Sequence, residues 1–220
     1  MTLATCYNIG KTMNRFTERQ QFSSDVYISD FTQYRNERLK ADATSEVLED
    51  EKIPHGVDIT EAASPIVDSF HISNKRHVSI TAINFERNMQ YFRDADGNDL
   101  SQCECLTYAD GATSKGWLML HELKYCKSSN IETNFDAAVG QIERTFLHLR
   151  DDFQDNPFLK DGQFRYYWII SIPEHTDESP FDGFAYDGDR ILEMNRQYNC
   201  NIWGVNEVEV LNTGYLKAVK

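Results

Sequence analysis

The sequence of 220 residues predicts a mixed α/β sandwich. Residues 77–85 are rich in β-branched side chains, which is typical of a strand. Two further short runs, 104–108 and 116–125, flank an Asp-Gly turn signal at Asp110 and predict a hairpin. Residues 166–172 form a nearly continuous apolar run of strand length, which indicates a central strand covered on both faces.

Helices are predicted on both sides of this apolar strand in the chain. Residues 134–150 open with an N-capping residue type and carry apolar side chains at helical spacing. These apolar positions are Phe135, Ala138, Val139, Ile142, Phe146 and Leu149. A second helix is expected at 190–198, and residues 202–211 close the chain as one last strand or a pair.

The N-terminal part is expected to stand apart from this core. The aromatic-rich segment 14–41 predicts short helical pieces with an apolar stripe. Residues 42–58 hold a dense acidic cluster with Pro and Gly, which predicts an exposed linker before a short helix around 60–70. We therefore divide the chain into an N-terminal helical extension with an acidic linker, 1–58, and a core, 59–220.

Composition narrows the class of protein. Hydrophobic residues make up 40% of the chain and aromatic residues 12%, which excludes collagen-like, linker-like and mostly disordered chains. No apolar run is long enough to span a bilayer, and the five cysteines form no Cys-x-x-Cys pair. We expect a soluble cytoplasmic protein with reduced thiols and no membrane partner. Its net charge of −13 would repel a polyanion unless basic residues gather in one place.

The segment 103–127 carries the most chemistry. If the hairpin turn is centred near residue 113, Glu104 lies opposite Glu122, and Lys124 shares their face because side chains alternate along a strand. Two opposed carboxylates repel each other, and a divalent cation between them removes the repulsion. Carboxylates that hold Mg²⁺, beside an ammonium that orients water or stabilises negative charge, suit phosphodiester hydrolysis.

These residues resemble the PD-(D/E)xK nuclease superfamily. The resemblance rests on the acid Glu104, the Glu-x-Lys of Glu122 and Lys124, and Gln141 on the following helix, and it covers roughly residues 83–211. It implies a restriction-endonuclease-like mixed central sheet flanked by helices. It also implies that Glu104 and Glu122 ligate Mg²⁺ or Mn²⁺, that Lys124 acts at the nucleophilic water and that Gln141 places substrate.

Alternatives to these assignments remain open. The first acid of the family is usually aspartate, so Asp110 competes with Glu104 for this role, although its place beside a glycine favours a turn. Many members also use an acid that precedes the hairpin, for which Glu86 is the candidate. The alternative function is a catalytically silent nuclease-fold subunit that binds or scaffolds within a larger complex.

Other conspicuous residues have simpler interpretations. His121 is expected to pack in the core, and Cys103, Cys105 and Cys126 to be small buried side chains. The acidic segment 174–189 is expected to be a polar loop. A path for phosphates could be lined by the basic residues Lys75, Arg76, Arg87, Arg93, Lys124 and Lys127. We expect the isolated chain to bind nucleic acid weakly, with a second copy or a partner subunit supplying further phosphate contacts.

Overall fold

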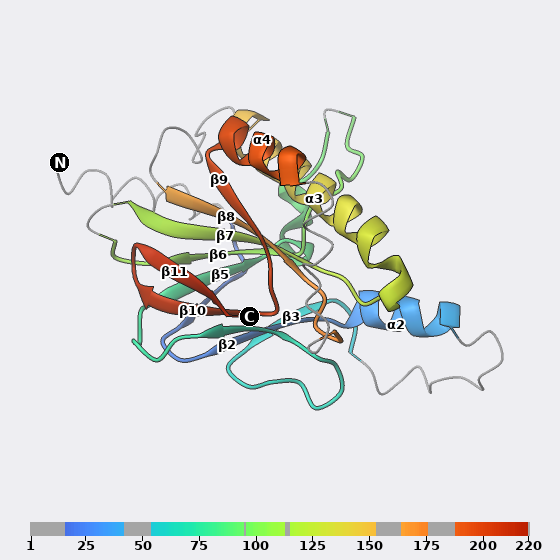
Figure 1. The fold of residues 1–220 in the computed structure, drawn as a ribbon, viewed down its shortest axis with the longest axis horizontal. Coiled ribbons are helices and arrows are strands. Elements are labelled where there is room, and N and C mark those ends of the chain that lie inside the picture. Colours follow the sequence, from blue (N-terminus) through green and yellow to red (C-terminus); the bar gives the residue numbers. More distant parts are fainter. Residues whose placement is uncertain are drawn as a thin grey trace.

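A computed structural model describes residues 16–41, 54–94, 96–112, 115–152, 164–175 and 188–219. These residues form three layers, in which helices and a second sheet cover opposite faces of a six-stranded sheet (Figure 1). The mixed α/β class predicted from the sequence is therefore confirmed. Among these residues, no helix has both the length and the hydropathy needed to cross a membrane.

The six-stranded sheet, called here the central sheet, is mixed. Its strands in spatial order are β1 (Arg19–Phe22), β5 (Ile80–Asn84), β6 (Cys105–Ala109), β7 (Gly116–Leu123), β8 (Phe164–Ser171) and β9 (Cys200–Gly204). The first four strands pair antiparallel, whereas β7, β8 and β9 are parallel. As predicted from its apolar run, β8 lies inside the sheet and is buried on both faces.

The second sheet, called here the outer sheet, has five strands. Their spatial order is β11 (Tyr215–Val219), β10 (Glu207–Asn212), β4 (Phe70–Ser73), β2 (Val26–Asp30) and β3 (Val57–Thr60). Only β4 and β10 pair in parallel. The segment predicted to form one last strand or two forms two, β9 in the central sheet and β10 in the outer sheet. Strand β11 was not predicted.

Three α-helices accompany the sheets in the described part of the chain. They are α2 (Phe31–Ala41), α3 (Ile131–Leu147) and α4 (Gly188–Tyr198). Helix α3 starts three residues before the predicted start and continues as a single π-helical turn over His148–Asp152. Short 3₁₀ turns lie at Glu86–Tyr91 and Ser128–Asn130. In Figure 1, α3 and α4 lie on one side of the central sheet and the outer sheet lies on the other.

Alternation along β7 divides the core into two parts. Leu118 and Leu120 pack toward the helix layer, whereas Trp117 and Met119 pack toward the outer sheet. The predicted apolar stripe of α3 covers the first of these faces, with Ile142 fully buried. The same alternation places Glu122 on the face that α3 covers.

The predictions for the N-terminal part and its junction were partly wrong. Segment 14–41 is not only helical, because β1 pairs with β5 of the central sheet and β2 pairs with β4 of the outer sheet. These long-range pairings override local helical patterning. No helix forms at 60–70: the Ser64 hydroxyl accepts hydrogen bonds from the backbone N–H groups of Ile66 and Val67, which competes with a helical turn. Residues 42–53 of the predicted linker and 176–187 of the predicted polar loop lie outside the described residues.

Candidate functional site

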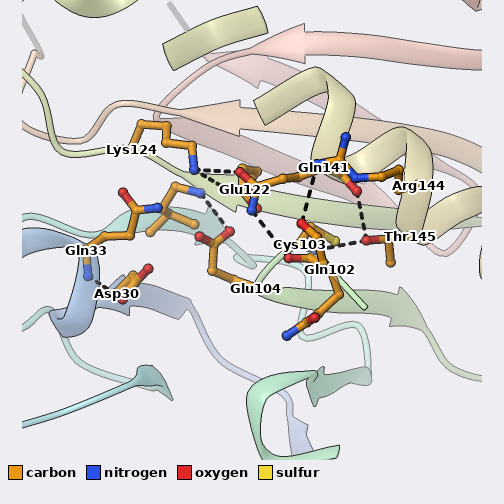
Figure 2. A network of polar contacts seen from close by, with 12 residues as sticks. Asp30, Gln33, Gln102, Cys103, Glu104, Glu122, Lys124, Gln141, Arg144 and Thr145 are labelled. Atoms are coloured by element: carbon orange, nitrogen blue, oxygen red, sulfur yellow. Dashed lines mark hydrogen bonds and ion pairs between the residues drawn. The ribbon is translucent and has the colours of Figure 1, made fainter. Parts of the chain in front are cut away.

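The register of the β6–β7 hairpin agrees with the prediction as far as Cys105 and His121, and Glu104, directly before β6, lies beside Glu122. Cys105 pairs with His121 and Leu106 with Leu120, so Glu104 precedes β6 by one residue at the level of Glu122. The backbone N–H of Glu104 donates to the carbonyl of His121 at 3.0 Å. In return, the N–H of Leu123 donates to Oε2 of Glu104 at 2.9 Å, which holds this carboxylate beside β7 (Figure 2).

Lys124 joins the acids of the hairpin to helix α3. Its Nζ donates to Oε1 of Glu122 at 2.5 Å and to Oε1 of Gln141 at 2.9 Å (Figure 2). The Glu122 residue has no exposed surface and Lys124 is 5% exposed, so this is a buried ion pair. The backbone N–H of Lys124 also donates to the carbonyl of Ser171 at 2.8 Å, which ties the end of β7 to β8.

Gln141 reaches the site because α3 is fixed over the central sheet. Its neighbours Ile142 and Phe146 are buried in the core, which turns the amide of Gln141 toward the hairpin. Thr145, one helical turn later, accepts a hydrogen bond from the backbone N–H of Cys103 at 2.8 Å. Helix α3 is thus attached to the residue directly before Glu104, and the structure brings all four predicted site residues into one cluster.

Burial and mutual repulsion alter the acidity of this cluster. Burial, and then the charge of Glu122, raise the pKa of Glu104 well above its usual value. Burial also raises the pKa of Glu122, although the adjacent Lys124 opposes this. Burial alone would lower the pKa of Lys124, but the two carboxylates outweigh it and the pKa is raised. One ammonium therefore faces two carboxyl groups, and a bound proton or a further cation relieves the excess negative charge.

Asp30 is a site residue that the sequence reasoning missed. It ends β2, is 5% exposed, and its carboxylate accepts a hydrogen bond from the backbone N–H of Gln33 at 2.9 Å in the first turn of α2. Its pKa is raised by burial first, and its carboxyl group interacts with that of Glu104. A usable signal was present, since an alternating run that ends in Asp before a polar helix is typical of a strand whose final residue caps a helix.

A pocket of about 320 Å³ opens beside the cluster. Carboxyl groups line it from four residues, Asp30, Glu37, Glu86 and Glu104. Carboxamides line it from four more, Gln33, Asn36, Gln102 and Gln141. Neither lysine nor arginine is among the described residues that line this pocket, which makes it strongly acidic.

Glu86, the candidate for a further acid, is at the wall of this pocket. Its Oε2 accepts a hydrogen bond from the backbone N–H of Val57 at 2.8 Å. Gly56 lies directly beneath it with φ of +86°, and a Cβ there would be 2.4 Å from Oε2 of Glu86. Glu86 thus fastens β3 against the central sheet, and this contact occupies one of its two carboxylate oxygens.

Asp110, the rival of Glu104, lies at the opposite end of β6. Its Oδ2 accepts hydrogen bonds from the hydroxyls of Ser79 at 3.1 Å and Thr81 at 2.7 Å. These contacts close the loop between β6 and β7 onto β5. The structure therefore gives Asp110 a place in the turn and separates it from Glu122 by the length of the strand.

The basic residues expected to line a phosphate path do not all lie near this cluster. Lys75 and Arg76 precede β5 at its Ile80 end, whereas Glu104 lies beside the other end, where Asn84 pairs with Cys105. Lys124 is buried against Glu122. Arg87 is exposed next to Glu86, at the site end of β5. The predicted set is thus spread over both ends of the sheet.

His121 and the hairpin cysteines are core residues, as predicted. His121 is fully buried, its Nε2 lies 2.7 Å from the hydroxyl of Thr107, and burial lowers its pKa to about 3. Burial raises the pKa of Cys103 and of Cys105 well above the usual value for a thiol. Neither thiol is therefore a ready nucleophile.

Glu104 and Glu122 are the residues of the cluster that could hold a hard divalent cation. Within the part of the chain that the structure describes, no three His, Cys, Asp or Glu residues have the arrangement of a metal site. Mg²⁺ is commonly held by one or two carboxylates with water in its remaining positions, and Glu104 and Glu122 can supply two. Oε2 of Glu122 is buried without a hydrogen-bond partner among the described residues, so it has unused capacity for a cation or a proton.

Comparisons with protein-family models, with curated proteins and with solved structures find no match for this chain. The chemistry of the cluster itself is therefore the basis on which a function is inferred. Two adjoining carboxyl groups, an ammonium and a carboxamide can bind a cation, orient a water molecule and stabilise developing negative charge.

Proposed function

We propose that this chain catalyses metal-dependent hydrolysis of phosphodiester bonds in nucleic acid at a site of the PD-(D/E)xK type. The contact of Lys124 with both Glu122 and Gln141 carries the proposal, since it unites the residues that the family motif separates in sequence. The antiparallel hairpin, the helix over it and the parallel strand β8 support a restriction-endonuclease-like arrangement of the central sheet.

Each residue of the cluster has a role in this proposal. Glu104 and Glu122 hold Mg²⁺ or Mn²⁺, which when bound polarises the phosphate and lowers the pKa of a water molecule. Lys124 orients the attacking water and stabilises negative charge that develops on the phosphate. Gln141 fixes the ammonium of Lys124 by accepting its hydrogen bond. Asp30 adds a further carboxylate next to Glu104.

The negative charge of the chain limits its affinity for nucleic acid in this proposal. A net charge of −13 opposes approach of a polyanion, so the isolated chain binds nucleic acid weakly and a second copy or another subunit supplies most phosphate contacts. A salt titration of binding by the purified chain tests this, because few phosphate contacts give a shallow slope of log affinity against log salt. A location in the cytoplasm agrees with the free thiols of the four described cysteines.

The direct test is cleavage of labelled DNA and RNA oligonucleotides with Mg²⁺, with Mn²⁺ or with EDTA. Cleavage should require a divalent cation and should be lost in both Glu122→Gln and Lys124→Met, each assayed under conditions in which circular dichroism shows that the variant is folded. The matched control is the pair of Glu209, partly exposed, and Lys217, exposed, on the outer sheet, whose charged atoms are 3.6 Å apart. Glu209→Gln and Lys217→Met should cleave normally. Cleavage that persists in EDTA, or in both site variants, contradicts the proposal.

The second candidate is a catalytically silent nuclease-fold subunit that binds or scaffolds. The deep burial of Glu122 favours it, because a substrate does not reach this carboxylate without passing Glu104. For this candidate, Mg²⁺ neither supports cleavage nor raises the melting temperature of the purified chain. If Mg²⁺ raises the melting temperature of the wild type but not that of Glu104→Gln, the cluster binds the cation. That result would contradict a silent subunit that no longer binds a metal.

A further inference from the structure

The acidic pocket adjoins the cluster, because Glu104 and Gln141 belong to both. Glu122 has no exposed surface and Lys124 has 5%, so neither is approached directly from solvent. Glu104 and Gln141 both contact this pair and also line the pocket. A phosphodiester that reacts at the cluster must therefore enter beside these two residues.

The size of the pocket limits what can enter. A volume of about 320 Å³ accommodates one nucleotide unit, whereas an intact base pair with both of its backbones does not fit. The pocket is partly open to solvent, and enzymes that take a base into a pocket use single strands or swing one nucleotide out of the duplex. The dimensions thus favour an unpaired nucleotide.

The lining decides which part of that nucleotide lies inside. Carboxylates surround the interior of the pocket without a basic residue among its described lining, so an uncharged base is tolerated there and a phosphate is repelled. A phosphate is attracted only at the Glu104 edge, where a cation held by Glu104 and Glu122 would offset the carboxylates. Gln33 and Asn36 lie three residues apart on α2 and face the pocket together. Their carboxamides make no hydrogen bond to another described residue, so they are available to a ligand. Carboxamides pair with the donor and acceptor edge of a base, and carboxylates accept from exocyclic amino groups.

We propose that the pocket between α2 and the hairpin receives one unpaired nucleobase that carries an exocyclic amino group, read by Gln33 and Asn36. This inference rests on the proposed function and assigns to it single-stranded or locally opened nucleic acid as the substrate. The phosphate of the same nucleotide remains at the Glu104 side of the pocket. Thymine and uracil lack the amino group and are disfavoured by the surrounding carboxylates.

The test measures binding and cleavage separately. Fluorescence anisotropy at low salt compares labelled single strands of cytidine and of thymidine nucleotides, and a blunt duplex, on Glu122→Gln protein, which binds without turnover. The cytidine strand should bind about fivefold or more tighter than either other probe. Adding Gln33→Ala and Asn36→Ala together should remove this preference without changing the salt dependence, since no phosphate contact is lost. Gln20→Ala, an exposed carboxamide on β1 outside the pocket, is the control.

The outcomes separate this inference from the proposed function. Equal binding of single strand and duplex, equal binding of cytidine and thymidine strands, or an unchanged preference in the α2 variant overturns the pocket assignment. Absence of binding to every probe overturns it as well. Wild-type cleavage of duplex without any preference retains the nuclease and removes the base pocket. A base preference without cleavage retains the pocket and contradicts the nuclease.

Discussion

The ammonium of Lys124 lies 2.9 Å from the side-chain carbonyl of Gln141, and this contact joins the end of β7 to the middle of α3. The same ammonium neutralises Glu122, which has no exposed surface. The stability of the fold and the proposed cleavage therefore depend on the same side chains, so substitution of Glu122 or Lys124 should change both.

Lys124→Met should strongly destabilise the fold, because it leaves Glu122 buried without its counter-charge. Removal of one partner from a buried pair costs about 3–5 kcal/mol. The double variant Glu122→Gln with Lys124→Met removes the charge as well and should recover a large part of this loss. Urea unfolding of the wild type, both single variants and the double variant measures the coupling. Additive losses in the double variant would contradict a direct ion pair.

Glu104 should make the metal-free protein less stable as pH rises. Its pKa is raised in the folded state above the usual value near 4.5, so the folded state holds the proton more tightly than the unfolded state. Stability from this proton is present at low pH and is lost as pH rises from about 4.5 through the raised pKa. Denaturant unfolding in EDTA between pH 5 and 8 should show this loss, and Glu104→Gln should reduce it. An unchanged pH profile in Glu104→Gln, with Glu209→Gln as the control, would contradict the assignment.

His121 should make the protein less stable as pH falls, which is the opposite of the effect of Glu104. Burial lowers its pKa from 6.5 to about 3, so the unfolded state takes up a proton first as the solution is acidified. Its contribution to stability is full above pH 6.5 and is lost as pH falls toward 3, by about 3–5 kcal/mol in total. His121→Gln should lower stability at pH 7 but should weaken the further loss between pH 7 and 4. Parallel pH profiles for variant and wild type would show that His121 is not buried in the neutral form.

Asp110 and Glu104 should differ in their effects on activity. Asp110→Ala removes two hydrogen bonds to Ser79 and Thr81, which should cost about 1–2 kcal/mol of stability but leave cleavage intact. Glu104→Gln should abolish metal-dependent cleavage in a folded protein. Circular dichroism confirms folding for both, and the oligonucleotide assay decides between them. If Asp110→Ala abolishes cleavage and Glu104→Gln does not, Asp110 and not Glu104 is the first acidic residue of the site.

The hairpin and its register could be predicted because they depend on local chemistry. A turn signal at Asp110 and period-two alternation set which residues face each other, and the structure has Leu106 opposite Leu120 as predicted. The place of Gln141 followed from the apolar stripe of α3, since burial of Ile142 and Phe146 fixes the rotation of the helix.

The pairing of the N-terminal strands with distant strands could not be predicted from local sequence patterns. The segment that ends at Asp30 is a strand because β4 lies beside it, and that pairing joins residues more than forty positions apart, such as Val26 and Ile72. Local patterning carries no information about such a partner, and strand propensity depends on it. The sequence can indicate that a strand ends at Asp30, but it cannot indicate that this strand lies beside β4, so it does not place Asp30 at the site.

The sequence by itself determined the α/β class, the hairpin register and the group formed by Glu104, Glu122, Lys124 and Gln141, because each depends on periodicity within one or two neighbouring elements. Tertiary structure decided that a second sheet covers the central sheet and that Asp30 and α2 complete the acidic pocket beside Glu104. It also decided the protonation of the cluster, since the pKa of Glu104 is raised by burial and by the nearby charge of Glu122. Burial depends on which distant elements pack over a residue, and no local pattern specifies them.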